Sequence, residues 1–205
     1  FYAAYHGPEG LKQIAQSVRS KANTLATKIN ELGYDLRSSV FFDTISIHTK
    51  SQTQEIFSAA NDQLINIRML DEDHISISLD ETTTNHEVNK IVKLFKPIER
   101  KEKVIMSFDL PADLQRSSKY LTHPVFHMYR TETEMLRYIR KLCDKDIALD
   151  RAMIPLGSCT MKLNATSEMI PVGWEEFSNI HPYAPNDQTD GYKILIEDLE
   201  TQLSE

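Results

Sequence analysis

Apolar residues between positions 8 and 32 recur every three or four residues, which is the period of a helix that buries one face. The repeating residues are Leu11, Ile14, Ala15, Val18, Ala22, Leu25, Ala26, Ile29 and Leu32. Pro8 suits the first turn, where the N–H that proline lacks would have no partner. Gly33 is the residue type that most readily adopts the left-handed conformation after a helix. The pattern therefore predicts a long amphipathic helix over 8–32.

Between residues 39 and 79 the pattern changes to an alternation of apolar and polar residues, which is typical of strands. Residues 39–48 form one such stretch, and residues 65–69 and 75–79 form two more. The last two are separated by Asp71-Glu72-Asp73-His74, a sequence rich in turn formers. The sequence therefore predicts one strand followed by a β-hairpin.

Two shorter helices complete this part of the chain. Ser51 with Gln54, ahead of a helix over 52–63, and Thr84 with Glu87 both have the spacing of a capping box. The second helix would bury Val88, Ile91, Val92 and Phe95. The order α-β-α-β-β-α over residues 1–95 predicts a small α+β domain, an antiparallel sheet with helices on one face.

The rest of the chain is less regular. Residues 96–107 are charged and follow no period, so we interpret them as a linker. Thr131 with Glu134 forms a third capping box, ahead of a helix. The apolar stripe of this helix comprises Met135, Leu136, Ile139, Leu142 and Cys143. A last helix begins near Asp190 and would carry Ile194, Leu195, Leu199 and Leu203 inward. We expect residues 108–205 to form a mainly helical and irregular arm.

Composition narrows the class of protein. The net charge of −7 is unlike that of nucleic-acid binders, which carry a basic patch or stripe. No apolar run approaches the ~18 residues that suggest a membrane span, and no signal peptide is visible at the start. Two cysteines are too few for a disulfide framework, which favours a reducing, intracellular compartment. The chain begins at Phe1 and ends at Glu205 inside a helical pattern, so we expect both ends to be cut from a longer chain.

The most unusual string is residues 153–164, Met-Ile-Pro-Leu-Gly-Ser-Cys-Thr-Met-Lys-Leu-Asn. Gly157 allows a tight turn, after which the hydroxyls of Ser158 and Thr160 could hold a phosphate or carboxylate. Lys162 could add a positive charge. Short Gly-Ser-Thr strings are also common turn material, so the spacing alone favours a plain turn. Cys159 would be a nucleophile only if a nearby cation activated it, and a buried, inert thiol is the favoured interpretation.

Histidines supply the other candidate sites. His123 and His127 are four residues apart, as metal ligands on one helical face would be. Pro124 argues against an unbroken helix, and no third ligand is evident, so we predict no metal site. His181, in the string His181-Pro182-Tyr183, would either line a pocket or form an interfacial turn.

Eight strings, taken together, resemble the glycine cleavage P-protein family. They are Ala4–Leu11, Phe41–Thr44, Ile75–Thr82, Leu121–Phe126, Thr131–Met135, Met153–Asn164, Phe177–Pro182 and Gly191-Tyr192. The resemblance covers essentially the whole chain, in order and without large gaps. His127 and Arg130 depart from the family pattern, which has Asn and His at these positions.

The resemblance implies a parent enzyme with two halves, each of the fold-type-I, aminotransferase-like α/β architecture, on one chain or on two subunits. Residues 1–95 would be the small C-terminal domain of the first half, and residues 96–107 the linker. Residues 108–205 would be the N-terminal arm of the second half, which carries the cofactor, and would stop before its large domain.

The resemblance also implies an oxidoreductase that uses pyridoxal 5'-phosphate to decarboxylate glycine and passes the aminomethyl group to the lipoyl group of the H-protein. Its Schiff-base lysine would lie beyond Glu205, so the chain alone is expected to be inactive and Lys162 is not that lysine. The resemblance favours Ser158, Cys159 and Thr160 as residues that line the cofactor site. It implies a dimeric or α2β2 parent, cytoplasmic in bacteria and mitochondrial in eukaryotes.

Two other functions stay open at this point. The same features fit a non-catalytic α+β interaction module with an arm that docks on another subunit. Another fold-type-I enzyme, such as a decarboxylase or an aminotransferase, is less consistent with the Gly-Ser-Cys-Thr-Met-Lys string.

Overall fold

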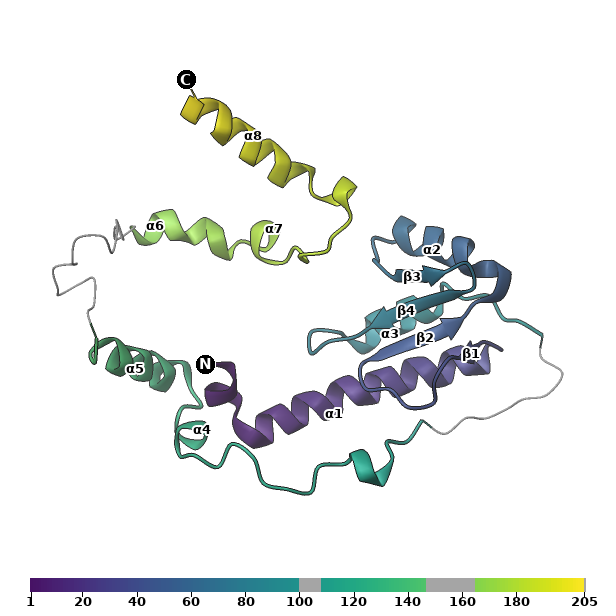
Figure 1. Ribbon diagram of the computed structural model, residues 1–205, viewed down its shortest axis with the longest axis horizontal. Helices are drawn as coiled ribbons and strands as arrows, with labels where there is room; N and C mark the ends of the chain where they lie inside the picture. Colours follow the sequence, from purple (N-terminus) through teal and green to yellow (C-terminus); the bar gives the residue numbers. More distant parts are fainter. Residues whose placement is uncertain (100–107, 147–164, 205) are drawn as a thin grey trace. The chain divides into compact units, whose positions relative to one another are not determined.

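The computed structural model describes residues 1–99, 108–146 and 165–204, drawn as ribbon in Figure 1. The contacts between residues group the chain into two compact units, residues 1–139 and residues 140–205.

The long first helix, α1 (Tyr2–Glu31), is broken near its start. Gly7 has φ 63° and ψ −176°, which no residue of a regular helix adopts. Pro8 follows directly and starts the long part of the helix, as its missing N–H predicts. Gly33 follows the helix with φ 100°, which confirms the predicted left-handed residue. The short helical turn ahead of Gly7 was not predicted, because five residues are too few to show a period.

Four short strands form one antiparallel sheet in the order β1-β2-β4-β3. They are β1 (Asp35–Leu36), β2 (Thr44–His48), β3 (Arg68–Asp71) and β4 (His74–Ser78). The predicted hairpin is β3 and β4, with Asp71 opposite His74 across the turn. The predicted strand over 39–48 starts only at Thr44, and β1 was missed because two residues cannot show alternation.

Helices α2 (Thr53–Asp62) and α3 (Asn85–Val92) follow the strands as predicted, but only one of their two predicted caps forms. The Thr84–Glu87 capping box is confirmed, since the Glu87 N–H donates to Thr84 Oγ1 at 3.2 Å and the Thr84 N–H donates to Glu87 Oε2 at 2.6 Å. The Ser51–Gln54 box is wrong. A 3-10 turn, η1 (Lys50–Gln52), precedes α2 and makes Gln52 the N-cap, with no side-chain hydrogen bond.

One apolar cluster holds these elements together. Ile45 lies opposite Ile77 and Ile47 opposite Ile75, so four isoleucines share one face of the sheet. Buried residues from all three helices pack against them: Ala22, Leu25, Ala26, Ile29, Ile56, Ala60, Val88 and Ile91. The opposite face carries Thr44, Ser46, His48, His74, Ser76 and Ser78. The order with β1 added is α-β-β-α-β-β-α, and the predicted α+β domain with helices on one face is confirmed.

Residues 108–139 pack onto this domain and belong to the same unit. They form a 3-10 turn, η2 (Ala112–Leu114), a short helix α4 (Val125–Met128) and the start of α5 (Glu132–Cys143). Phe108 joins the apolar cluster. The capping box at Thr131 is confirmed, because the Glu134 N–H donates to Thr131 Oγ1 at 3.2 Å.

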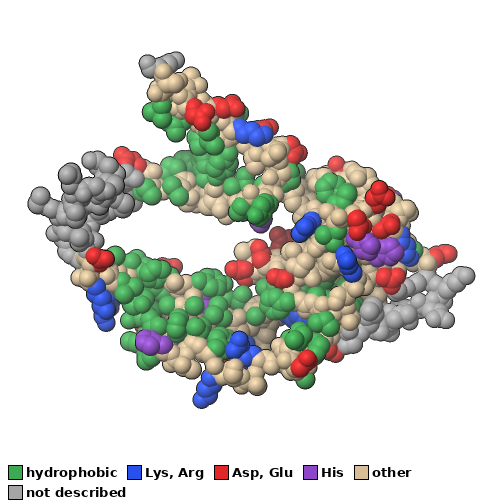
Figure 2. All heavy atoms as spheres, in the orientation of Figure 1, with side chains coloured by type: hydrophobic (Ala, Val, Ile, Leu, Met, Phe, Trp, Pro, Cys, Tyr) green, Lys and Arg blue, Asp and Glu red, His purple; other side chains and the backbone are tan. Residues whose placement is uncertain are grey.

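The second unit is a series of short helices and turns. Its elements are α6 (Thr166–Met169), η3 (Ile170–Gly173), α7 (Glu175–Ser178), η4 (Asn186–Gln188) and α8 (Asp190–Ser204). Helix α8 begins where predicted, but Ile194, Leu195, Leu199 and Leu203 are exposed, so the prediction that they point inward is wrong for the described residues. Figure 2 shows hydrophobic side chains along the surface of α6 to α8. None of the helices in the described ranges is long and apolar enough to cross a membrane.

Candidate functional site

The residues favoured for a cofactor site, Ser158, Cys159 and Thr160, lie outside the described residues, as does the whole string 153–164. Their grouping around a ligand therefore stays a prediction. The described residues show instead how residues 108–139, the start of the arm, are held on the first domain, and which hollows and polar clusters lie on that unit.

Both histidines of the pair in the arm form hydrogen bonds with backbone groups. His123 Nδ1 accepts from the N–H of Val125 at 3.2 Å, and His127 Nε2 lies 2.9 Å from the carbonyl oxygen of Leu121. Pro124 is the N-cap of α4, which confirms that the helix does not run through both histidines. Within the described residues no three His, Cys, Asp or Glu side chains are grouped as metal ligands.

His181 forms a turn in the second unit. Its Nδ1 accepts from the N–H of Tyr183 at 3.0 Å, and the side chain of Tyr183 is 90% exposed. Of the two interpretations of this string, the structure favours the turn, because the hydrogen bond closes it and Tyr183 is exposed to solvent.

Two arginines anchor the arm on α1. The Arg19 guanidinium lies 4.5 Å from the Phe41 ring centre and donates to the carbonyls of Phe41 and Phe108. Burial lowers the pKa of Arg19, opposed by the nearby Asp109. Tyr120, between the two anchors, donates its O–H to the carbonyl of Pro8 at 2.6 Å.

The second anchor is Arg130, which closes over the break in α1. Its guanidinium donates to the carbonyls of Ala4 at 2.7 Å and Tyr5 at 3.0 Å, and to that of Phe126 in α4. A Cβ built on Gly7 would lie 2.0 Å from Arg130 Nη2. Glycine is therefore required at position 7 for the arginine to approach as well as for the positive φ.

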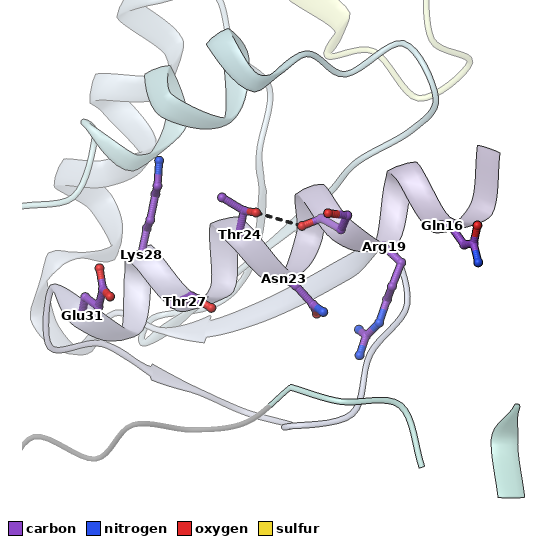
Figure 3. A pocket seen from close by; sticks show the side chains of 8 residues that line it. Gln16, Arg19, Asn23, Thr24, Thr27, Lys28 and Glu31 are labelled. Atoms are coloured by element: carbon purple, nitrogen blue, oxygen red, sulfur yellow. Dashed lines mark hydrogen bonds between the residues drawn. The ribbon is translucent and has the colours of Figure 1, made fainter. Parts of the chain in front are cut away.

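Two hollows open on the surface of α1. A shallow one of about 570 Å³ lies over its polar face, and Figure 3 shows the lining side chains of Gln16, Arg19, Asn23, Thr24, Thr27, Lys28 and Glu31 along one side of the helix. Asn23 Oδ1 is buried there and has no hydrogen-bond partner in the described part of the chain. A larger groove of about 960 Å³ lies between the first half of α1 and residues 110–122 of the arm. Both are open to solvent, unlike the enclosed pockets that hold a cofactor.

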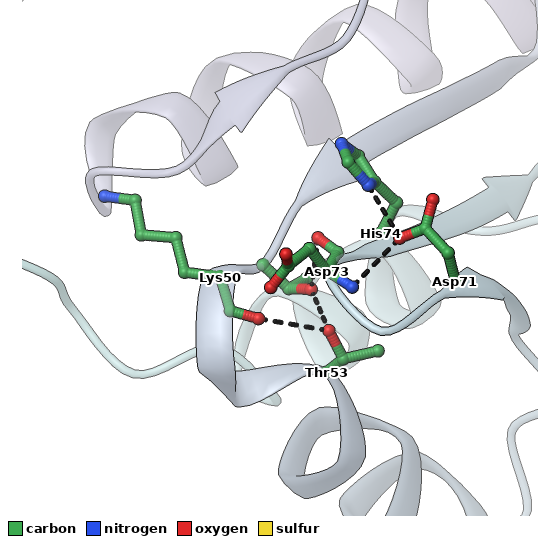
Figure 4. A network of polar contacts seen from close by, with 6 residues as sticks. Lys50, Thr53, Asp71, Asp73 and His74 are labelled. Atoms are coloured by element: carbon green, nitrogen blue, oxygen red, sulfur yellow. Dashed lines mark hydrogen bonds and ion pairs between the residues drawn. The ribbon is translucent and has the colours of Figure 1, made fainter.

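A polar network fixes the hairpin turn against the start of α2 (Figure 4). Asp71 Oδ1 accepts from the N–H of Asp73 at 2.9 Å and lies 2.7 Å from His74 Nδ1. The hydrogen bond with His74 is the main reason that the pKa of Asp71 lies below its usual value. Thr53 Oγ1 donates to the Lys50 carbonyl at 3.3 Å. Thr49 Oγ1 donates to the Asp73 carbonyl at 2.9 Å, and this hydrogen bond joins the hairpin turn to the residues ahead of α2, so the network stabilises the structure of this region.

Comparison with known proteins gives a consistent match. Residues 1–95 match the family model of the glycine cleavage system P-protein. Over 98% of its length the chain is 50% identical to the glycine dehydrogenase (decarboxylating) of Cupriavidus metallidurans and to that of Rhizobium meliloti, and 48% identical to that of Pelagibacter ubique. The chain spans 21% of the length of each of these relatives.

Proposed function

We propose that the chain belongs to the glycine cleavage system P-protein family and is a segment of a glycine dehydrogenase (decarboxylating). The full enzyme would decarboxylate glycine and pass the aminomethyl group to the lipoyl group of the H-protein. The observation that supports this proposal is 50% identity over 98% of the chain to proteins of that name. When bound to the full enzyme, pyridoxal phosphate would supply the electron sink for the loss of CO2.

The role proposed for this segment is to line and position the cofactor site. Ser158, Cys159 and Thr160 would face the cofactor, with Gly157 allowing the backbone to turn close to it. The match between this string and the family motif supports the assignment. The lysine that binds the cofactor would lie in another part of the enzyme, so the segment alone would be inactive.

We also propose the division of the segment within its parent. Residues 1–95 would be the small domain of the first aminotransferase-like half, and residues 108–205 the arm of the second half, joined by residues 96–107. The antiparallel sheet with helices on one face is compatible with such a small domain. The anchors at Arg19 and Arg130 give the arm a defined place on it.

The first test compares the 205-residue chain with the full enzyme. We expect the chain alone to retain no protein-bound absorbance band of pyridoxal phosphate after the unbound cofactor is removed, and to give no exchange of bicarbonate into glycine, whereas the full enzyme gives both. A bound-cofactor band in the chain alone would show that the lysine is within it and would contradict the proposal.

The second test places the site. We expect Ser158→Ala and Thr160→Ala in the full enzyme to weaken pyridoxal phosphate binding or lower the exchange rate by about tenfold, the cost of one lost hydrogen bond to a charged group. The matched control is Ser178→Ala, an exposed serine of α7. Unchanged binding and exchange in both variants would remove these residues from the site.

A second candidate is a non-catalytic interaction module with a docking arm. The anchoring of residues 108–139 on the first domain and the exposed apolar residues of α8 favour it. The exchange assay separates the two, because a full protein that binds partners but never exchanges bicarbonate would support the module and contradict the enzyme.

A further inference from the structure

The groove between α1 and the arm has an apolar floor. Its volume is about 960 Å³, and α1 contributes one wall and residues 110–122 the other. The apolar lining residues are Pro8, Leu11, Ala15, Phe42, Leu110 and Leu114. Leu114 is 58% exposed and Phe42 48% exposed, so the floor faces solvent within the first unit. A solvated apolar floor bordered by polar residues is the pattern of an interaction site.

The rim of this groove is basic. Lys12 on α1 and Arg116 and Lys119 on the arm are exposed lining residues, and Glu9 is the one carboxylate among the lining residues. Lys12, Arg116 and Lys119 form no ion pair with any described residue. Arg19 also lines the groove, but its guanidinium is held by two backbone carbonyls. A positive rim is notable in a chain of net charge −7.

We propose that this groove docks an acidic segment of a partner protein that carries apolar side chains. The apolar side chains would pack on Leu11, Ala15 and Leu114, and carboxylates would pair with the cations of the rim. Complementary charge steers such an encounter and fixes its register. This inference does not depend on the proposed enzymatic function.

A peptide segment fits the groove better than a small anion. A phosphate or nucleotide site requires donors that converge on one point, often backbone N–H groups. Here the three cations are exposed and come from two separate stretches of chain, and the apolar floor lies between them. Carboxylates spaced along a partner chain match this arrangement, whereas a compact anion would leave most of the apolar floor uncovered.

Fluorescence anisotropy with a labelled peptide tests the proposal. The probe carries glutamates beside a leucine stripe, and its partner probe has glutamine at each glutamate. We expect the 205-residue chain to bind the acidic probe and to bind it more weakly as salt is raised. The triple variant Lys12→Glu, Arg116→Glu, Lys119→Glu should weaken binding about tenfold, the sum of three exposed charge pairs. Leu114→Ser should weaken it severalfold by removing floor contact.

The matched control reverses three exposed charges away from the groove, Arg68→Glu, Lys93→Glu and Lys141→Glu, and should leave affinity within about twofold at moderate salt. Equal binding of the two probes, or equal weakening by both triple variants, would overturn the proposal. So would binding of inorganic phosphate or ATP with no binding of the peptide, which would indicate a small-anion site. Binding to the chain but not to the full-length protein would mean that another part of the same protein fills the groove, and would also overturn it.

Discussion

At the scale of single residues, the contact between Gly7 and Arg130 decides how the arm meets the first domain. Gly7 lets α1 break at a positive φ and leaves room for the guanidinium, which then binds the carbonyls of Ala4 and Tyr5 just before the break. The carbonyl of Ala4 cannot form the usual helical hydrogen bond, because the residue four positions later is Pro8, and the N–H groups of the guanidinium supply a donor. No local sequence pattern predicts this role for Arg130, because Ala4 and Tyr5 lie more than 120 residues away in the chain.

We expect Gly7→Ala to lower the free energy of unfolding by about 2 kcal/mol or more, because an alanine at φ 63° and ψ −176° costs roughly 1–3 kcal/mol and its Cβ would collide with Arg130. Urea unfolding followed by circular dichroism measures the change. In an Arg130→Ala background the collision with the guanidinium disappears and only that with the Phe126 carbonyl oxygen, 2.6 Å from the added Cβ, is left, so the cost of Gly7→Ala should fall. Gly191→Ala, on an open side of α8, is the control and should be neutral or stabilising. Equal effects at both glycines would contradict this account.

At the scale of elements, two capping boxes of similar sequence have different outcomes. Thr84 and Glu87 exchange hydrogen bonds at the start of α3. Ser51 instead lies inside a 3-10 turn, because Thr49 ahead of it bonds the Asp73 carbonyl at 2.9 Å and places the chain for an earlier turn. A local spacing of Ser and Gln therefore predicts a cap only when no tertiary contact competes with it.

The two caps form a matched pair of tests. Thr84→Ala should lower the free energy of unfolding by about 1 kcal/mol, the usual cost of a lost N-cap. Ser51→Ala should change it by less than about 0.5 kcal/mol, since the exposed Ser51 side chain caps no helix. Denaturant unfolding of both variants measures the difference. Similar losses in both would show that the Ser51 box forms after all.

The cap at Thr84 should also depend on pH. Hydrogen bonds from the Thr84 backbone and hydroxyl hold the pKa of Glu87 below its usual value. The stabilisation is therefore fully present above the pKa of about 4.3 in the unfolded chain, and is lost as pH falls through the lower pKa of the folded state. Unfolding measured from neutral to acid pH should show a smaller acid loss in Glu87→Gln than in the wild type. An identical acid profile would contradict the assignment.

At the scale of the whole molecule, the first unit extends through residue 139 and so includes the start of the arm. Arg19 binds Phe108, Tyr120 binds Pro8 and Arg130 binds the first turn of α1, so three separate points of the arm are fixed on one helix. Anchors spread in this way define the position of a segment that has little regular structure of its own.

A split chain tests this arrangement. Residues 1–99 and residues 108–205, produced as two polypeptides, should associate and elute together in size-exclusion chromatography. Arg19→Ala and Arg130→Ala should each weaken the association about tenfold or more, because each leaves carbonyl groups without a charged donor. Arg37→Ala, at an exposed position outside these contacts, is the control. Failure of the wild-type pieces to associate would show that the anchors do not hold the arm.

Only part of the candidate site could be predicted from the sequence. The string from Gly157 to Lys162 was singled out by its composition and by family resemblance, and its place in space stays a prediction because it lies outside the described residues. The basic groove and the two arginine anchors were missed. Their members, such as Lys12 and Lys119 or Ala4 and Arg130, are far apart in the chain, and no local pattern connects them.

The sequence by itself determined the amphipathic helix of α1, the β3–β4 hairpin, the cap of α3 and the family that the chain resembles. These features follow from residue type and from the spacing of apolar residues, which indicates the face that each helix or strand buries. Tertiary structure alone decided the strand order, the break closed by Arg130 and the exposure of the apolar residues of α8. These three features depend on which distant segments of the chain come into contact. The chemical type of a residue determines which groups it can bind, but it does not determine which groups will lie next to it in the folded chain.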